Sequence, residues 1–110
     1  MSIYQLSDSV SVSSQIRTDD VANLADMGFT TIICNRPDGE DFGQPTADEI
    51  AEACATRDMS FYHIPVDRSG LTKDMVENFH GAVTQSKGKV LAYCRSGQRS
   101  SMLWQACGSP

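Results

Sequence analysis

Short runs of apolar and β-branched residues recur along this chain and predict five β-strands. They span Ile3–Leu6, Val10–Ser13, Thr30–Cys34, Ser60–Val66 and Val90–Tyr93. Asp8 lies between the first two runs, which we expect to form a hairpin. The run at 30–34, Thr-Thr-Ile-Ile-Cys, has no alternating polar positions, a pattern typical of a strand that is buried on both faces.

Four further stretches place apolar residues at helical spacing and predict helices between the strands. The expected N-caps are Thr18 for the first helix, Thr46 (in a capping box with Glu49) for the second and Thr72 for the third, and the fourth helix is expected from about Gln98. Gly28 is expected to end the first helix. The residues expected to face the core are Val21, Leu24, Ala25, Ala47, Ile50, Cys54, Met75, Val76, Phe79, Val83, Trp104 and the methionines at helical spacing.

Strands that alternate with helices predict a single α/β domain over residues 1–110. Such a chain forms parallel β-α units, so we expect a mostly parallel sheet of four to five strands with helices on both faces. A chain of 110 residues buries about 60–70% of the surface of its unfolded state, which is enough for one modest core. Ligands of such sheets bind beyond the carboxyl ends of the strands, and a functional site is expected there.

The composition narrows the classes of function. The formal net charge of −5 argues against a general nucleic-acid-binding role. No apolar run approaches the ~20 residues that span a bilayer, and no secretion signal follows Met1, so we expect a cytoplasmic protein and no membrane partner. The cysteines at 34, 54, 94 and 107 include no Cys-x-x-Cys pair, so neither a zinc knuckle nor a thioredoxin motif is indicated, and no metal or other cofactor is expected.

The segment Cys94-Arg-Ser-Gly-Gln-Arg-Ser100, directly after the last predicted strand, carries the strongest functional signal. A short loop between a strand and a helix can aim several backbone N–H groups at one point, as anion-binding nests do. Those donors would lower the pKa of Cys94 and hold it as the nucleophilic thiolate. The expected anion-binding residues are Arg99, as a bidentate clamp, with Arg95, Ser96, Gly97, Gln98 and Ser100; Arg95 is expected to point outward and steer anions. The alternative is a structural cysteine followed by a turn glycine.

Two other strand ends carry polar residues that we expect to meet this loop. Asn35 and Arg36 follow the strand at 30–34, and Asp67 and Arg68 follow the strand at 60–66. The loop at 35–45 is long, and loops of this length are often functional. Its candidate substrate contacts are Arg36 and Asp38, to which we add Arg68.

From Phe61 to Trp104 the sequence resembles dual-specificity protein tyrosine phosphatases, through His-Ile-Pro-Val-Asp at 63–67 and through the cysteine loop. It is more closely similar to a bacterial phosphatase-like family that is also found fused to beta-lactamase-like hydrolases. That similarity covers nearly the whole chain and includes Asn-Arg-Pro-Asp-Gly-Glu at 35–40, Gly-Gln-Pro at 43–45 and Cys-Arg-Ser-Gly-x-Arg-Ser-x-x-Leu-Trp at 94–104.

The resemblance implies a tyrosine-phosphatase-like three-layer fold and a hydrolase that forms a cysteinyl-phosphate on Cys94. It also implies that Asp67, which follows Ile-Pro-Val, is the general acid that protonates the leaving group. The alternative for Asp67 is a turn aspartate before Ser69-Gly70.

Two departures from tyrosine phosphatases keep a second function open. Their signature is His-Cys-x5-Arg, whereas this loop is Cys-x4-Arg and Tyr93 precedes the cysteine. The shorter loop loses one inward N–H and resembles that of rhodaneses, which carry a sulfane sulfur on the cysteine as a persulfide. Three functions therefore stay open: hydrolysis of phosphate monoesters, sulfur transfer from thiosulfate or a persulfide, and non-catalytic anion binding.

Smaller alternatives also stay open. Ser100 either hydrogen-bonds the Cys94 thiolate or is an ordinary residue of the helix N-terminus. Cys34 is either a resolving thiol or, more simply, a buried strand cysteine. His63 and His80 are expected to be structural. Ordinary tyrosine phosphatases continue with further helices after the active-site helix, so the site here is expected to be open or covered by a second subunit of a homodimer.

Overall fold

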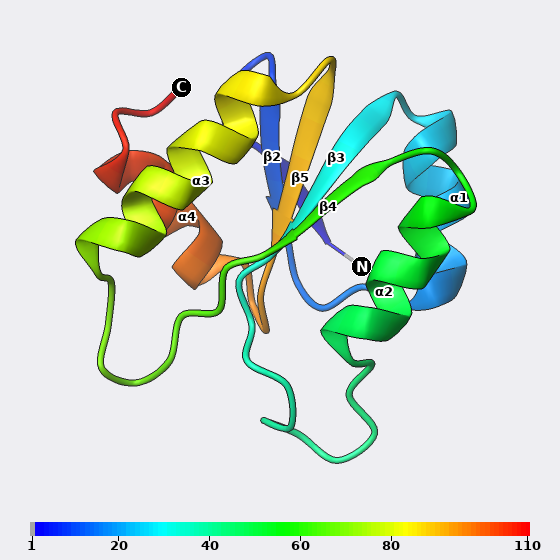
Figure 1. Ribbon diagram of the computed structural model, residues 1–110, viewed down its shortest axis with the longest axis horizontal. Coiled ribbons are helices and arrows are strands. Elements are labelled where there is room, and N and C mark those ends of the chain that lie inside the picture. Colours follow the sequence, from blue (N-terminus) through cyan, green and yellow to red (C-terminus); the bar gives the residue numbers. More distant parts are fainter. Residues whose placement is uncertain (1) are drawn as a thin grey trace.

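The computed structural model describes residues 2–110, which form a five-stranded sheet between two pairs of helices (Figure 1). The elements in chain order are β1 (Ile3–Gln5), β2 (Val10–Ser13), α1 (Thr18–Asp26), β3 (Phe29–Cys34), α2 (Ala47–Ala55), β4 (Ser60–His63), α3 (Lys73–Gln85), β5 (Lys89–Tyr93) and α4 (Gln98–Ala106). The strand order is β1-β2-β5-β3-β4. Strand β1 pairs antiparallel with β2, and the other pairs are parallel. The predicted α/β fold with helices on both faces is confirmed.

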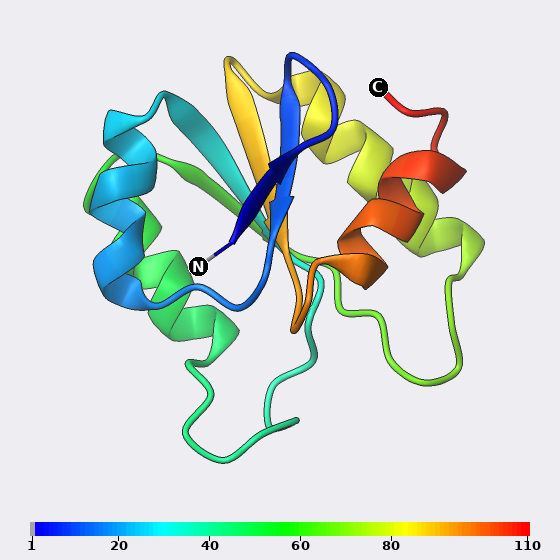
Figure 2. The same ribbon diagram turned by 180° about the vertical axis from the view of Figure 1, so that it is seen from behind.

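Each face of the sheet carries its own apolar core. Helices α1 and α2 cover one face, and α3 and α4 cover the other (Figure 1). Figure 2 shows the sheet from behind, with β1 crossing in front of it. The central strands β3 and β5 contribute Ile32, Ile33 and Leu91, all fully buried, which explains why their sequences lack polar alternation.

Two of the three predicted N-caps are confirmed. Thr46 accepts a hydrogen bond from the Glu49 N–H, and Thr72 accepts one from the Met75 N–H. The cap of α1 is Arg17 rather than Thr18. There the Arg17 N–H donates to the Asp20 carboxylate at 2.8 Å, so an acidic side chain three residues inside the helix does the capping.

Strand β4 is shorter than the predicted run, because it ends at His63 instead of Val66. The N–H groups of Ile64 and Val66 donate to the carbonyls of Cys34 and Asn35, which are adjacent residues. A regular parallel ladder advances by two residues on both strands, so the pairing breaks at this point, and Pro65 has no N–H to continue it. Strand β1 likewise ends at Gln5 rather than at Leu6, and β3 begins one residue early, at Phe29.

Gly28 ends α1 as predicted, with φ +96° and its N–H bonded to the Ala25 carbonyl. The expectation that methionines at helical spacing lie in the core is wrong for Met102, which is 44% exposed on α4. Met27, just after α1, is also exposed. Trp104 is only partly buried and packs against the core beneath α3 and α4.

The carboxyl ends of the parallel strands meet at one edge of the sheet, the lower edge in Figure 1. Cys34, at the end of β3, lies opposite Tyr93 of β5 and His63 of β4. The loops at 35–46, 64–72 and 94–97 therefore start side by side, as the sequence predicts. Within residues 2–110, no helix is both long enough and apolar enough to cross a bilayer.

Candidate active site

Cys94 lies buried between the end of β5 and the N-terminus of α4. The Gly97 N–H donates to its sulfur at 3.0 Å. Burial raises the pKa of this thiol, but the backbone N–H groups of Ser100, Ser96, Gly97 and Arg99 outweigh burial and lower its pKa below the ordinary value. The loop thus provides the ring of amides that the sequence predicts, and it favours the thiolate.

Gly97 gives this loop its shape. Its φ of +94° is in the left-handed region, which side chains other than glycine's rarely adopt. A Cβ at this position would also lie 3.4 Å from the Ser13 carbonyl oxygen. Cys94 N–H donates to the same carbonyl, so the loop is held closely against the end of β2.

Ser100 directs its hydroxyl away from the sulfur. The hydroxyl donates to Asn35 Oδ1 at 2.8 Å, and both side chains are fully buried. Asn35 in turn donates through Nδ2 to the Ile64 carbonyl at 2.9 Å. The Asn35 side chain therefore ties the start of α4 to the loop that follows β4, a role that the sequence analysis did not assign.

Arg99 is held at three of its five N–H groups. Its Nη1 donates to the Val66 carbonyl and to Glu40 Oε2, both at 2.8 Å, and its Nη2 donates to Glu40 Oε1 at 2.9 Å. The remaining N–H groups, on Nε and Nη2, lie on one side of the guanidinium and form an open two-donor fork. The hydrogen bond to Glu40 is the main cause that raises the pKa of Arg99, and the nearby Cys94 raises it further.

Glu40 is a site residue that the sequence analysis missed. Its Oε1 also accepts a hydrogen bond from Arg36 Nε at 2.8 Å. The hydrogen bond to Arg99 is the main cause that lowers the Glu40 pKa, to about 2, so Glu40 is a carboxylate at neutral pH. The available signal was its place at the end of the Asn-Arg-Pro-Asp-Gly-Glu run.

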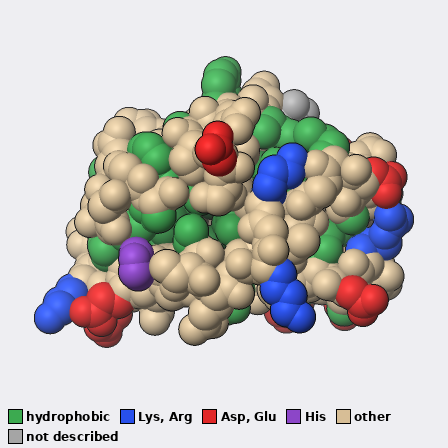
Figure 3. Space-filling model, turned by 90° about the horizontal axis from the view of Figure 1, so that it is seen from above, with side chains coloured by type: hydrophobic (Ala, Val, Ile, Leu, Met, Phe, Trp, Pro, Cys, Tyr) green, Lys and Arg blue, Asp and Glu red, His purple; other side chains and the backbone are tan. Residues whose placement is uncertain are grey.

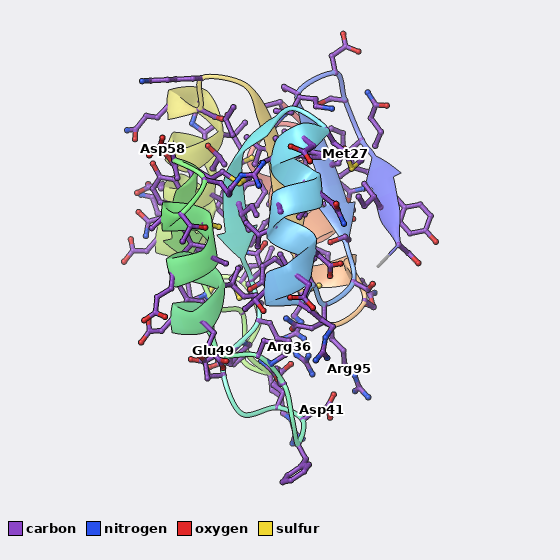
Figure 4. The ribbon with its side chains drawn as sticks, turned by 90° about the vertical axis from the view of Figure 1, so that its right-hand side faces the viewer. Met27, Arg36, Asp41, Glu49, Asp58 and Arg95 are labelled. Atoms are coloured by element: carbon purple, nitrogen blue, oxygen red, sulfur yellow. The ribbon has the colours of Figure 1, made fainter. Side chains whose placement is uncertain are left out.

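Arg36 is buried behind this site, with only 3% of its side chain exposed. Besides Glu40, its guanidinium donates to Gln15 and, at 2.7 Å, to Asp41. Figure 4 shows Arg36 and Arg95 just above Asp41 at the lower edge of the molecule. Asp38, the other loop residue predicted to contact substrate, accepts a hydrogen bond from the Ala47 N–H at the start of α2. Both side chains therefore hold the loop in place.

Asp67 lies in an exposed turn. Its Oδ1 accepts hydrogen bonds from the Ser69 N–H and hydroxyl, and the hydroxyl bond is the main cause that lowers the Asp67 pKa. The Gly70 N–H donates to the Asp67 carbonyl, which closes the turn. This geometry favours the turn aspartate over an acid that is ready to donate a proton.

A cavity of about 420 Å³ lies at this edge of the molecule. It is lined by Gly39, Glu40, Arg68, Arg95 and Arg99. The side chain of Arg95 is 70% exposed, which agrees with its predicted outward direction. Ser96 and Gln98 are also exposed, and the Ser96 hydroxyl accepts a hydrogen bond from the Gln98 N–H.

Two side chains near the site, Cys34 and His63, both contact the Arg36 carbonyl. The Cys34 thiol donates to the Arg36 carbonyl at 3.4 Å, and burial raises its pKa. His63 Nε2 lies 3.0 Å from the same carbonyl oxygen, in agreement with its predicted structural role. All four cysteines are free thiols. Among residues 2–110, no three His, Cys, Asp or Glu side chains are grouped so that they could hold a metal ion.

Comparisons with known proteins place this site in context. The family model for the phosphatase-like domain of beta-lactamase hydrolase-like proteins matches residues 2–109. A beta-lactamase hydrolase-like protein of Xylella fastidiosa (strain Temecula1) is 33% identical over 104 residues. That match covers 94% of this chain but 24% of the relative, so the chain spans about a quarter of the length of the curated relatives it matches.

Two solved structures with the same fold are described as candidate phosphatases. One from Neisseria meningitidis Z2491 is 38% identical, with a TM-score of 0.84 over 94% of this chain and 74% of the other. One from Shewanella putrefaciens CN-32 is 25% identical, with a TM-score of 0.82 over 96% of this chain and 68% of the other. The structure of PTPMT1 is 17% identical, with a TM-score of 0.73 over 96% of this chain and 69% of the other, and supports the fold alone.

Proposed function

The chain belongs to the phosphatase-like domain family of beta-lactamase hydrolase-like proteins, and we propose that it is a cysteine-dependent phosphatase that acts on small phosphate monoesters. One observation carries the proposal: backbone amides lower the pKa of Cys94, and Arg99, which interacts with it, keeps a two-donor fork open. A thiolate is the form of cysteine that attacks phosphorus, and a guanidinium fork matches two phosphate oxygens.

In the first step the Cys94 thiolate attacks the phosphorus atom. A sulfur–phosphorus bond forms and the ester phosphorus–oxygen bond breaks, so the leaving oxygen takes the electron pair. The amides of Ser96, Gly97, Arg99 and Ser100 and the fork of Arg99 stabilise the charge that develops on the phosphoryl oxygens. In the second step water attacks the phosphorus, inorganic phosphate is released, and the Cys94 thiolate returns.

We propose that Asp67 protonates only those leaving groups that need a proton. In the turn observed here it is bonded to Ser69 and its pKa is lowered, so it is ionised at neutral pH. Leaving groups of low pKa, such as p-nitrophenolate, depart without protonation. Alkyl esters need the proton, and for them Asp67 must first leave Ser69 and take up a proton from solvent water before it can donate one to the leaving oxygen.

Turnover of p-nitrophenyl phosphate tests the phosphatase directly. We expect hydrolysis by the wild-type chain and none by Cys94→Ser, while Arg99→Lys lowers kcat/KM by about two orders of magnitude because the fork is lost. Cys107→Ser is the matched control, since Cys107 lies at the far end of α4, and it should keep full activity. Absence of hydrolysis by the wild-type chain at every pH would contradict the proposal.

Sulfur transfer is the second candidate. Two features favour it: Asp67 is ionised and bonded to Ser69, and the Cys-x4-Arg loop is short. Here the Cys94 thiolate would attack the outer sulfur of thiosulfate, sulfite would leave with the electron pair of the sulfur–sulfur bond, and a persulfide would remain on Cys94. Cyanide would then take the outer sulfur as thiocyanate. No step needs a general acid.

The two candidates give different products. Thiocyanate, together with a Cys94 adduct heavier by one sulfur atom, would support sulfur transfer. If neither activity is found, non-catalytic anion binding remains.

We further propose a cytoplasmic location, where the free thiols stay reduced. A homodimer that covers the site stays a prediction, which sedimentation can test.

A further inference from the structure

The cavity beside Arg99 is larger than a site for one phosphoryl group needs to be. Its volume of about 420 Å³ lies in the range of pockets that enclose a whole small molecule. Its lining consists of one glycine, one glutamate and three arginines, without an apolar side chain. The walls therefore offer no apolar side chain for a ligand to pack against, and they favour a polar ligand.

Within residues 2–110, Arg68 and Arg95 are the two cations of this lining that have no ion pair shorter than 3.5 Å. Arg95 Nε is 3.5 Å from Asp41, whose carboxylate makes its closer contact, at 2.7 Å, with Arg36. Within residues 2–110, Arg68 makes no salt bridge in this structure. The third cation, Arg99, is already committed to Glu40 on one side and to the reacting group on the other.

This concentration of arginines is unusual for a chain with a formal net charge of −5. The opposite edge of the molecule carries Lys and Arg side chains too, but there they lie apart from one another (Figure 3). Like charges that face one cavity repel each other unless an anion lies between them. An anion between Arg68 and Arg95 would relieve that repulsion.

We propose that Arg68 and Arg95 bind a second anionic group of the substrate. The substrate class is then a compact polar molecule that carries two phosphate groups, or a phosphate and a carboxylate. One phosphate takes the place beside Cys94 and Arg99, and the other group binds between Arg68 and Arg95. This assignment rests on the proposed phosphatase function for the identity of the reacting group, whereas the second binding position depends only on the two arginines.

Calorimetric binding to the Cys94→Ser variant tests this without relying on turnover. The probes are glucose 6-phosphate and glucose 1,6-bisphosphate, which differ by a single phosphate group. We expect the bisphosphate to bind about tenfold more tightly, and we expect this preference to shrink as salt is added. In the same background, Arg68→Gln and Arg95→Gln should each remove about threefold of the preference, and the double variant should remove most of it.

Arg57→Gln is the matched control. Arg57 pairs with Asp26, and its neighbour Asp58 lies at the opposite edge in Figure 4. The Arg57→Gln variant should leave the preference for the bisphosphate unchanged. Equal affinity for the two probes, or a preference that survives the double variant, would overturn the inference. The outcome is independent of the phosphatase proposal, which falls instead if p-nitrophenyl phosphate is not hydrolysed.

Discussion

The Glu40 carboxylate binds the Arg99 guanidinium at two points, with 2.8 Å between Oε2 and Nη1 and 2.9 Å between Oε1 and Nη2. Because Val66 takes the outer hydrogen of Nη1, these contacts fix the plane of the guanidinium. They also leave the Nε and Nη2 donors together on the open side. Glu40 therefore acts on the substrate through Arg99, as a positioning residue.

Glu40→Gln should lower kcat/KM for p-nitrophenyl phosphate by about tenfold, because a neutral amide holds the guanidinium less firmly than a carboxylate does. The loss should appear mainly in kcat, since the Arg99 fork is used most strongly in the transition state. Glu52→Gln, which changes an exposed glutamate on α2, is the control. An unchanged kcat in Glu40→Gln would contradict the positioning role.

The same ion pair makes a prediction for stability against pH. The pKa of Glu40 is lowered from 4.5 to about 2, so its stabilising effect is complete above about pH 4.5 and is lost as the pH falls through 2. The difference in melting temperature between the wild-type chain and Glu40→Gln should therefore be constant from pH 5 to 7 and shrink below about 4. A difference that grows on acidification would have the wrong sign for this ion pair.

Ser100→Ala separates the two roles considered for that side chain. It removes the hydroxyl that donates to Asn35 and leaves a buried amide oxygen without its partner, which should cost about 1–3 kcal/mol of unfolding free energy. The pKa of Cys94 should stay nearly the same, because the backbone N–H of residue 100, and not its hydroxyl, lowers it. A large rise in the Cys94 pKa in this variant would show that the hydroxyl bonds the thiolate instead.

Asp67→Asn should change the turnover of p-nitrophenyl phosphate by less than about threefold, because its leaving group needs no proton. An alkyl phosphate should be affected more strongly if Asp67 can leave Ser69. The kcat values of the two substrates, measured side by side, check this prediction. A tenfold loss with the aryl substrate would mean that Asp67 is already placed to donate a proton.

The sequence predicts the edge of the sheet where the site lies, because parallel β-α connections force successive strand ends to the same side. It also predicts the amide ring, since a cysteine between a buried strand and a helix allows few other loop shapes. The amide ring depends on residues that are close together in the chain. The left-handed Gly97 is the local feature that makes this possible.

The contacts that the sequence does not reveal join segments that are far apart in the chain. Glu40 meets Arg99 across 59 residues, and Asn35 meets Ser100 across 65. In each contact one partner lies at the start of α4 and the other, Glu40 or Asn35, lies in the loop after β3, where no periodicity indicates which way a side chain points. The burial of Arg36 is hidden for the same reason, because only the folded loop shows its three polar partners.

Backbone amides lower the pKa of Cys94, and a pH titration of thiolate absorbance measures this effect directly. The difference between the spectra of the wild-type chain and Cys94→Ser isolates this one sulfur. We expect a midpoint below the ordinary pKa of a cysteine thiol, which is about 8.5, because the amides lower it. A midpoint at or above that value would show that burial outweighs the amides, and it would contradict both proposed reactions.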